Sequence, residues 1–153
     1  MIKLIATDID GTLVNDEKLF PPDFKDVIDI LEQKRIAFAV SSGRSYAALI
    51  DQFNFIADKI CFICDNGSYI VDKGKVVSRS VIPMKAVNEI IKVCMENDLR
   101  PLLCGENGTY YSSENLEYEK EVAKYYNNTV YLDSLYDCND NIFKIAIFGN
   151  SSK

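Results

Sequence analysis

The stretch at residues 2–13 constrains the fold of this chain more than any other part of its 153 residues. It begins with an apolar run, residues 2–6, of the length expected for a strand that is buried on both faces. The run ends at two carboxylates, Asp8 and Asp10, which are followed directly by Gly11. Open α/β sheets bind ligands at the carboxyl ends of their strands. The pattern therefore predicts an α/β fold with an acidic site where its first strand ends.

Two further apolar runs, 36–40 and 60–64, predict neighbouring strands. A helical pattern that begins near Pro22 separates the first of them from the N-terminal strand, and this spacing indicates a right-handed parallel β-α-β unit. The run 36–40 leads into Ser41-Ser42-Gly43-Arg44 and a second helical pattern, and the run 60–64 leads into Asp65-Asn66-Gly67. Because parallel neighbours end on the same edge of a sheet, these polar residues are expected near the two carboxylates.

Each polar segment has a simple explanation and a functional one. Ser42 could be an ordinary N-cap of the helix that follows, and Asn66-Gly67 reads most simply as a turn. A hydroxyl and a glycine before a helix also form a natural phosphate site, since free amides and the helix dipole face the ligand. Beside two carboxylates on the same sheet edge, we favour the phosphate site.

The second half of the chain has a different order of elements, beginning at Ile82-Pro83. Just before it, a hairpin is predicted around the polar turn 72–75. After it, the patterns predict an amphipathic helix at 84–97, strands at 99–104 and 109–111, a helix at 114–126 and a strand at 142–148.

The composition excludes several classes of function. A net charge of −6 argues against a nucleic-acid partner. No apolar run approaches the length of a membrane span, and no signal-peptide pattern is present, so a cytoplasmic protein is expected. The absence of histidine removes Ser-His-Asp and Cys-His catalysis. The five cysteines are an odd number, and we interpret them as core residues rather than as a disulfide framework.

The string D-I-D-G-T-L at residues 8–13 resembles the first motif of the haloacid dehalogenase superfamily, whose hydrolases pass a phosphoryl group through an aspartate. The resemblance implies that Asp8 is the nucleophile and that Asp10 is the general acid and base. It also implies that Gly11 and Thr12 contact the phosphate, and that Mg²⁺ binds Asp8 and the backbone carbonyl of Asp10. The implied fold is α/β: residues 1–83 form the N-terminal part of a Rossmann-like parallel-sheet core, and residues 84–153 form part of an inserted α/β cap.

Ser41-Ser42-Gly43-Arg44 resembles the T-G-R form of the second motif in the Cof-type, sugar-phosphatase-like branch of this superfamily. Ser42 falls at the position that holds the transferring phosphoryl group. Asn66 matches an asparagine that faces the substrate pocket in the same branch. The resemblance therefore implies that Ser42, Gly43, Arg44 and Asn66 bind the phosphate or the substrate.

The resemblance covers the whole chain but matches only the first two motifs well. The lysine of the third motif and the acidic residues of the fourth, which complete the magnesium site, are not evident. Asp137-Cys138-Asn139-Asp140 lacks the glycine of the fourth motif and precedes a predicted strand instead of following one. The resemblance thus implies the N-terminal portion of a longer hydrolase.

The implied function is that of a Mg²⁺-dependent phosphatase acting on a small phosphorylated metabolite such as a sugar phosphate. The alternative is a truncated or inactive haloacid dehalogenase-like protein that binds metal or a partner without turnover, and the missing motifs favour it for this polypeptide, though not for its family. A receiver-type domain would use Asp65 as its phosphoacceptor, but the first two motifs fit such a domain poorly.

The family topology places the first strand in the middle of the core sheet, with neighbours on one side that follow the cap. Residues 2–8 are therefore expected to form an edge strand with unpaired backbone groups. We expect this chain to self-associate through that strand, to bind magnesium weakly and to show little or no phosphatase activity.

Overall fold

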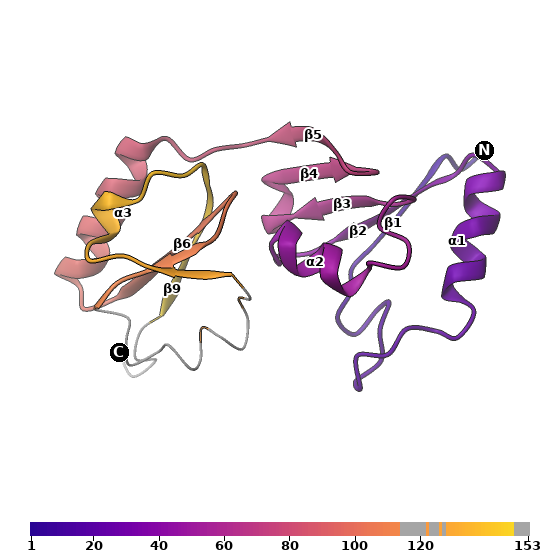
Figure 1. Cartoon of the computed structure of the whole chain (residues 1–153), viewed down its shortest axis with the longest axis horizontal. Helices are drawn as coiled ribbons and strands as arrows, with labels where there is room; N and C mark the ends of the chain where they lie inside the picture. The colour runs from indigo at the N-terminus through magenta and orange to yellow at the C-terminus, as the bar shows by residue number, and fades with distance from the viewer. Residues whose placement is uncertain (114–121, 123–125, 127, 149–153) are drawn as a thin grey trace. The chain divides into compact units, whose positions relative to one another are not determined.

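The computed structural model describes residues 1–113, 122, 126 and 128–148. The chain divides into two compact units, Met1–Arg79 and Ser80–Lys153 (Figure 1). The division into a core at residues 1–83 and a cap at residues 84–153 stays a prediction.

The first unit is built on a five-stranded sheet with the strand order β1-β2-β3-β4-β5. Its strands are β1 (Leu4–Thr7), β2 (Ala37–Ser41), β3 (Cys61–Cys64), β4 (Tyr69–Asp72) and β5 (Lys75–Arg79). β1, β2 and β3 are parallel, whereas β4 and β5 continue the sheet as an antiparallel hairpin. The helices α1 (Phe24–Gln33) and α2 (Tyr46–Gln52) connect the parallel strands. The predicted α/β, Rossmann-like arrangement is confirmed.

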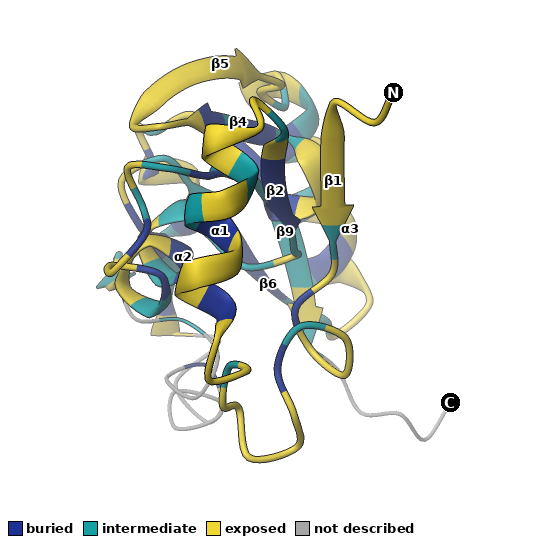
Figure 2. Ribbon diagram, turned by 90° about the vertical axis from the view of Figure 1, so that its right-hand side faces the viewer, coloured by how far each residue is buried: buried dark blue, intermediate teal, exposed yellow. Residues whose placement is uncertain are grey.

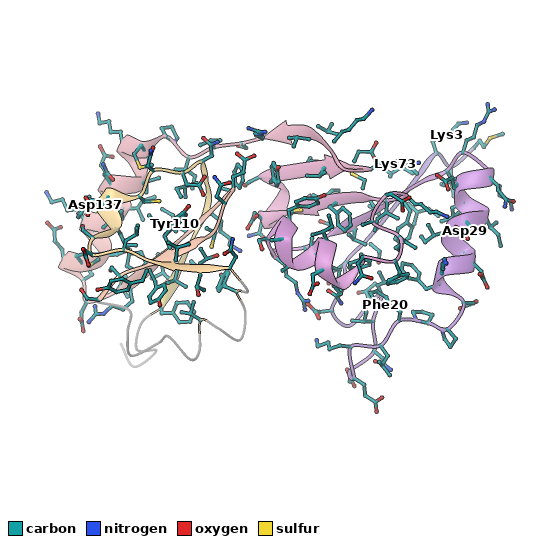
Figure 3. All side chains as sticks on the ribbon, in the orientation of Figure 1. Lys3, Phe20, Asp29, Lys73, Tyr110 and Asp137 are labelled. Atoms are coloured by element: carbon teal, nitrogen blue, oxygen red, sulfur yellow. The ribbon has the colours of Figure 1, made fainter. Side chains whose placement is uncertain are left out.

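The core of this unit forms between the sheet and its two helices. Phe62 on β3 and Phe53, which follows α2, are both fully buried. Phe20, labelled in Figure 3, makes ring contacts with Phe24 and Phe53. On α1, Phe24 and Ile28 are buried, whereas Val27 is exposed. The loop that carries Phe20 is thus anchored by an aromatic cluster.

The first strand differs from its prediction. Leu4 is 56% exposed and Ile5 is 37% exposed, so the expected burial on both faces is wrong for this structure (Figure 2). Among the described residues, β1 pairs only with β2 and lies at the end of the strand order. The expectation that the first strand is an edge is therefore confirmed, and the same fact explains its exposure.

The second unit contains a four-stranded sheet with the order β8-β7-β6-β9. Its elements are α3 (Met84–Glu96), β6 (Arg100–Gly105), β7 (Thr109–Tyr111), β8 (Thr129–Tyr131) and β9 (Ile142–Phe148), with a short 3-10 helix at Leu135–Asp137. Val87 and Ile91 of α3 pack with Leu103 and Ile142 of the sheet. The predicted helix at 84–97 and the strands at 99–104, 109–111 and 142–148 are confirmed, whereas most of the predicted helix at 114–126 lies outside the described residues.

The segment Asp137-Cys138-Asn139-Asp140, compared above with the fourth family motif, contains an aspartate with a structural role in the second unit. The carboxylate of Asp140 accepts hydrogen bonds from the backbone N–H and the side-chain amide of Asn107, both at 2.8 Å, and from the hydroxyl of Tyr110 at 3.0 Å. Burial, together with this bond to Asp140, raises the pKa of Tyr110. Asp140 therefore holds the turn between β6 and β7.

Candidate active site

The two carboxylates of the first motif are presented by a turn that a single buried residue anchors. Ile9 is fully buried, whereas Asp8 and Asp10 on either side of it are exposed. The carbonyl of Ile9 accepts the backbone N–H groups of Leu13 and Val14, both at 3.0 Å. Gly11 has a φ of +71°, which an L side chain rarely adopts. The local sequence thus fixes a tight turn that leaves both carboxylates in solvent at the end of β1.

The ends of β2 and β3 are joined by backbone hydrogen bonds. The N–H of Asn66 donates to the carbonyl of Ser42 at 3.2 Å, and the N–H of Asp65 donates to the carbonyl of Arg44 at 3.0 Å. A Cβ on Gly43 would lie 2.9 Å from Oδ1 of Asn66, so a larger residue at this position would displace the Asn66 side chain. Ser42, Gly43, Arg44 and Asn66 are therefore brought together, as the sequence predicts.

The structure separates the two possible roles of the serines near α2. Ser45 is the N-cap of this helix, with its Oγ accepting the N–H of Ala48 at 3.4 Å. Ser42 instead lies at the end of β2, half-buried, and its Oγ accepts the N–H of Arg44 at 3.2 Å. The N-cap explanation for Ser42 is wrong. Among the described residues nothing accepts the hydroxyl hydrogen of Ser42, which leaves it able to donate to a ligand.

An ion-pair network joins the first two motifs. Nη2 of Arg44 donates to both carboxylate oxygens of Asp10, at 2.9 and 2.8 Å, and its Nη1 donates to Oε1 of Gln52 at 3.0 Å. Nζ of Lys18 donates to Oδ1 of Asp10 at 2.7 Å. The hydrogen bond from Lys18 is the largest influence and lowers the pKa of the Asp10 carboxyl; burial opposes it, and the charge of Arg44 and its hydrogen bond lower the pKa further. Asp10 is therefore held as an ionised carboxylate, the form that accepts a proton.

Sequence reasoning missed two members of this network, Lys18 and Gln52. Lys18 lies in a polar loop outside any motif, and its contact with Asp10 depends on the path of that loop. Gln52 lies in the last turn of α2, where a lone glutamine carries no signal of function. Conversely, the side chains of Asp8 and Thr12 make no hydrogen bond to another predicted site residue within the described part of the chain. Gly11 and Thr12 instead border a cavity of about 500 Å³ lined by residues 11–16 and 19–22.

The oxygen donors at the end of β1 fit Mg²⁺ in chemistry. Carboxylate and carbonyl oxygens are the ligands that this ion prefers, and it usually keeps several waters. Asp8 offers a carboxylate and Asp10 a backbone carbonyl, since the carboxylate of Asp10 is engaged by Lys18 and Arg44. Across residues 1–113, 122, 126 and 128–148, no three acidic or cysteine side chains gather to hold a metal ion. The described donors would therefore leave most coordination positions to water and substrate.

Comparison with known proteins identifies the class of this fold and site. The family of haloacid dehalogenase-like hydrolases matches residues 5–153. The chain belongs to this family. Of the helices that the structure describes, none has the length and apolar character needed to cross a membrane.

Individual relatives extend well beyond the matched region. The 5-amino-6-(5-phospho-D-ribitylamino)uracil phosphatase YbjI of Escherichia coli (strain K12) is 31% identical over 149 residues, which are 95% of this chain and 55% of YbjI. The solved structure of SMU.1108c from Streptococcus mutans UA159 has a TM-score of 0.87 at 22% identity, covering 96% of this chain and 57% of its own. The HAD subclass IIB sugar phosphatase BT4131 has a TM-score of 0.64 at 23% identity, covering 84% and 52%. The chain thus spans slightly more than half the length of these proteins, and the two solved structures establish its fold.

Proposed function

We propose that this chain carries the nucleophile and part of the phosphate site of a Mg²⁺-dependent phosphomonoester hydrolase. The observation that supports it most is the meeting of the first two motifs at one end of the sheet, where Arg44 binds Asp10. Family membership gives the reaction class, and the exposed carboxylate of Asp8 gives a nucleophile. A carboxylate is a competent nucleophile because it is ionised at neutral pH.

The proposed reaction has two steps, and both are carried by the side chains of the first motif. In the first, a carboxylate oxygen of Asp8 attacks phosphorus, the bond from phosphorus to the ester oxygen breaks, and the departing oxygen takes a proton from Asp10. Asp10 must therefore bind a proton from solvent before this step, although Lys18 and Arg44 favour its ionised form in the free chain. In the second, Asp10 takes a proton from water, whose oxygen attacks the phosphorus of the aspartyl phosphate and releases Asp8 and inorganic phosphate. When bound, Mg²⁺ would neutralise charge on the phosphate oxygens, held by Asp8 and the carbonyl of Asp10.

Ser42, Arg44 and Asn66 are proposed to bind the phosphate or the substrate. Ser42 can donate its hydroxyl hydrogen to a phosphate oxygen, and Gly43 permits the close approach of Asn66. Asn66 has a φ of +58°, in the left-handed region that asparagine tolerates better than most residues. Gly11 and Thr12 would contact the phosphate from the loop after β1.

The substrate is proposed to be a small phosphorylated metabolite, such as a sugar phosphate. YbjI is named for a substrate in which phosphate is esterified to a ribityl chain, which is the reduced form of a sugar. The proposed substrate class can be tested with a panel of sugar and sugar-alcohol phosphates. Phosphate release is measured with and without Mg²⁺ in a chain that also carries the later family motifs. Turnover without Mg²⁺ would contradict the proposed cofactor.

A second candidate is an inactive member of the family that binds a metal or a partner without turnover. The observation in its favour is that the described residues supply no third acidic ligand to a metal site. Mg²⁺ binding by the 153-residue chain without phosphate release would support this candidate for the chain itself.

Two serines allow a matched test of the phosphate site. In a chain that also carries the later family motifs, we expect Ser42→Ala to lower turnover at least about tenfold, because a hydrogen bond to a charged group is lost, with little change in thermal stability. Ser45→Ala should do the opposite, lowering stability by about 1 kcal/mol through loss of the N-cap while turnover per folded molecule is retained. Measuring the turnover and the melting temperature of both variants distinguishes a phosphate-binding role from a structural one. A drop in stability without a drop in rate for Ser42→Ala would show that Ser42 has only a structural role.

A further inference from the structure

The loop at residues 15–19 is closed by hydrogen bonds among its own residues. The N–H of Asn15 donates to the carbonyl of Leu19 at 3.2 Å, and the N–H of Leu19 donates to Oδ1 of Asn15 at 2.8 Å. Within this closed turn, the N–H of Lys18 donates to the carbonyl of Asn15 at 2.9 Å. The backbone position of Lys18 is therefore set by the turn and does not depend on its side chain.

Lys18 occupies a backbone conformation that a lysine rarely adopts. Its φ is +62°, in the left-handed region, where glycine or asparagine fits at lower cost. Residues held in such conformations concentrate at functional sites. The sequence thus places a lysine where a residue without a positive charge would suit the backbone better.

The side chain of Lys18 reaches Asp10 of the first motif. Its Nζ lies 2.7 Å from Oδ1, the same oxygen that accepts Nη2 of Arg44 at 2.9 Å. The Lys18 and Asp10 side chains are 58% and 44% exposed, and ion pairs this exposed contribute little to folding. A gain in stability therefore does not explain a strained lysine at this position.

We propose that Lys18 is a positioning residue for Asp10, a role that rests on the function proposed above. Arg44 holds the Asp10 carboxylate from the end of β2, and Lys18 holds it from the loop after β1. Two cations from different segments restrict rotation of the carboxylate, whereas Arg44 alone leaves it freer to turn. Lys18 thereby keeps Asp10 in the orientation needed for proton transfer.

Substitution by asparagine separates this role from a structural one. Because asparagine suits a positive φ, Lys18→Asn should melt at the same temperature as the parent chain or slightly higher. In a chain that also carries the later family motifs, kcat should fall about tenfold with KM nearly unchanged, because the proposed role of Lys18 is to position Asp10 and not to bind the substrate. Lys18→Arg should restore most of the rate. Lys25→Asn, which removes an exposed lysine with no ion pair in the described part of the chain, is the control for lost charge and should leave kcat unchanged.

An NMR measurement on the 153-residue chain tests the positioning without relying on turnover. The side-chain carboxyl ¹³C signal of Asp10 should shift in Lys18→Asn, return toward the parent position in Lys18→Arg and stay in place in Lys25→Asn. An unchanged Asp10 signal, or an unchanged kcat in an active protein, would overturn the proposal. If a chain that also carries the later family motifs releases no phosphate while the Asp10 signal still responds to Lys18, the proposed function fails and the positioning of Asp10 by Lys18 stands.

Discussion

Asp8→Asn is expected to abolish phosphate release in a chain that also carries the later family motifs. A neutral amide cannot replace a carboxylate nucleophile, so the aspartyl phosphate cannot form. The fold should survive, because Asp8 is exposed and its side chain makes no hydrogen bond within the described residues. Phosphate release under saturating substrate, with circular dichroism to check folding, provides the measurement.

Substitutions of two further aspartates are compared with Asp8→Asn. Asp10→Asn should lower turnover by about 10²–10⁴-fold, the usual contribution of proton transfer. Asp51→Asn, which removes an exposed carboxylate on α2 that forms no ion pair in the described part of the chain, should leave turnover unchanged. Near-normal turnover of Asp8→Asn would exclude Asp8 as the nucleophile.

For the 153-residue chain itself, we propose self-association through the free edge of β1. Among the described residues this strand pairs on one side only, and Ile2, Leu4 and Ile5 are 66%, 56% and 37% exposed (Figure 2). An apolar strand with unpaired backbone groups is a template for pairing with another chain. Sedimentation velocity should therefore show an average mass that rises with protein concentration.

A matched pair of leucines tests where the contact lies. Leu4→Lys places a charge on the edge strand and should shift the equilibrium toward monomer. Leu19→Lys changes a leucine of similar exposure, 58% against 56%, that lies outside the sheet, and should leave self-association unchanged. A monomer at all concentrations, or equal effects of the two variants, would rule out pairing through β1.

The sequence patterns predict those strands and turns that are determined by residues close together in the sequence. The apolar runs around Phe38 and Phe62 both become strands: Phe38, Ala39 and Val40 are buried on both faces of β2, whereas β3 alternates between buried and half-buried residues. The turn after β3 is equally local, since Asn66 tolerates the positive φ that it adopts, and Gly43 after β2 leaves room for the Asn66 side chain. This is why the meeting of the first two motifs could be predicted before the structure.

Features that depend on distant neighbours could not be predicted in this way. An apolar run indicates a strand but not the number of its partners, so the exposure of Leu4 and Ile5 followed only from the topology. β8 is three residues long and poorly buried, too short for an alternating pattern to stand out. The role of Lys18 depends on a loop conformation with a positive φ, which lysine does not favour.

Trapping the covalent intermediate tests the central claim most directly. A chain that carries the later family motifs is quenched in acid during turnover of p-nitrophenyl phosphate, and its peptides are examined by mass spectrometry. We expect a phosphoryl group on Asp8 in the parent protein, and none on the corresponding peptide of Asp8→Asn. A phosphoryl group on a different residue, or phosphorylation that persists in Asp8→Asn, would contradict Asp8 as the nucleophile.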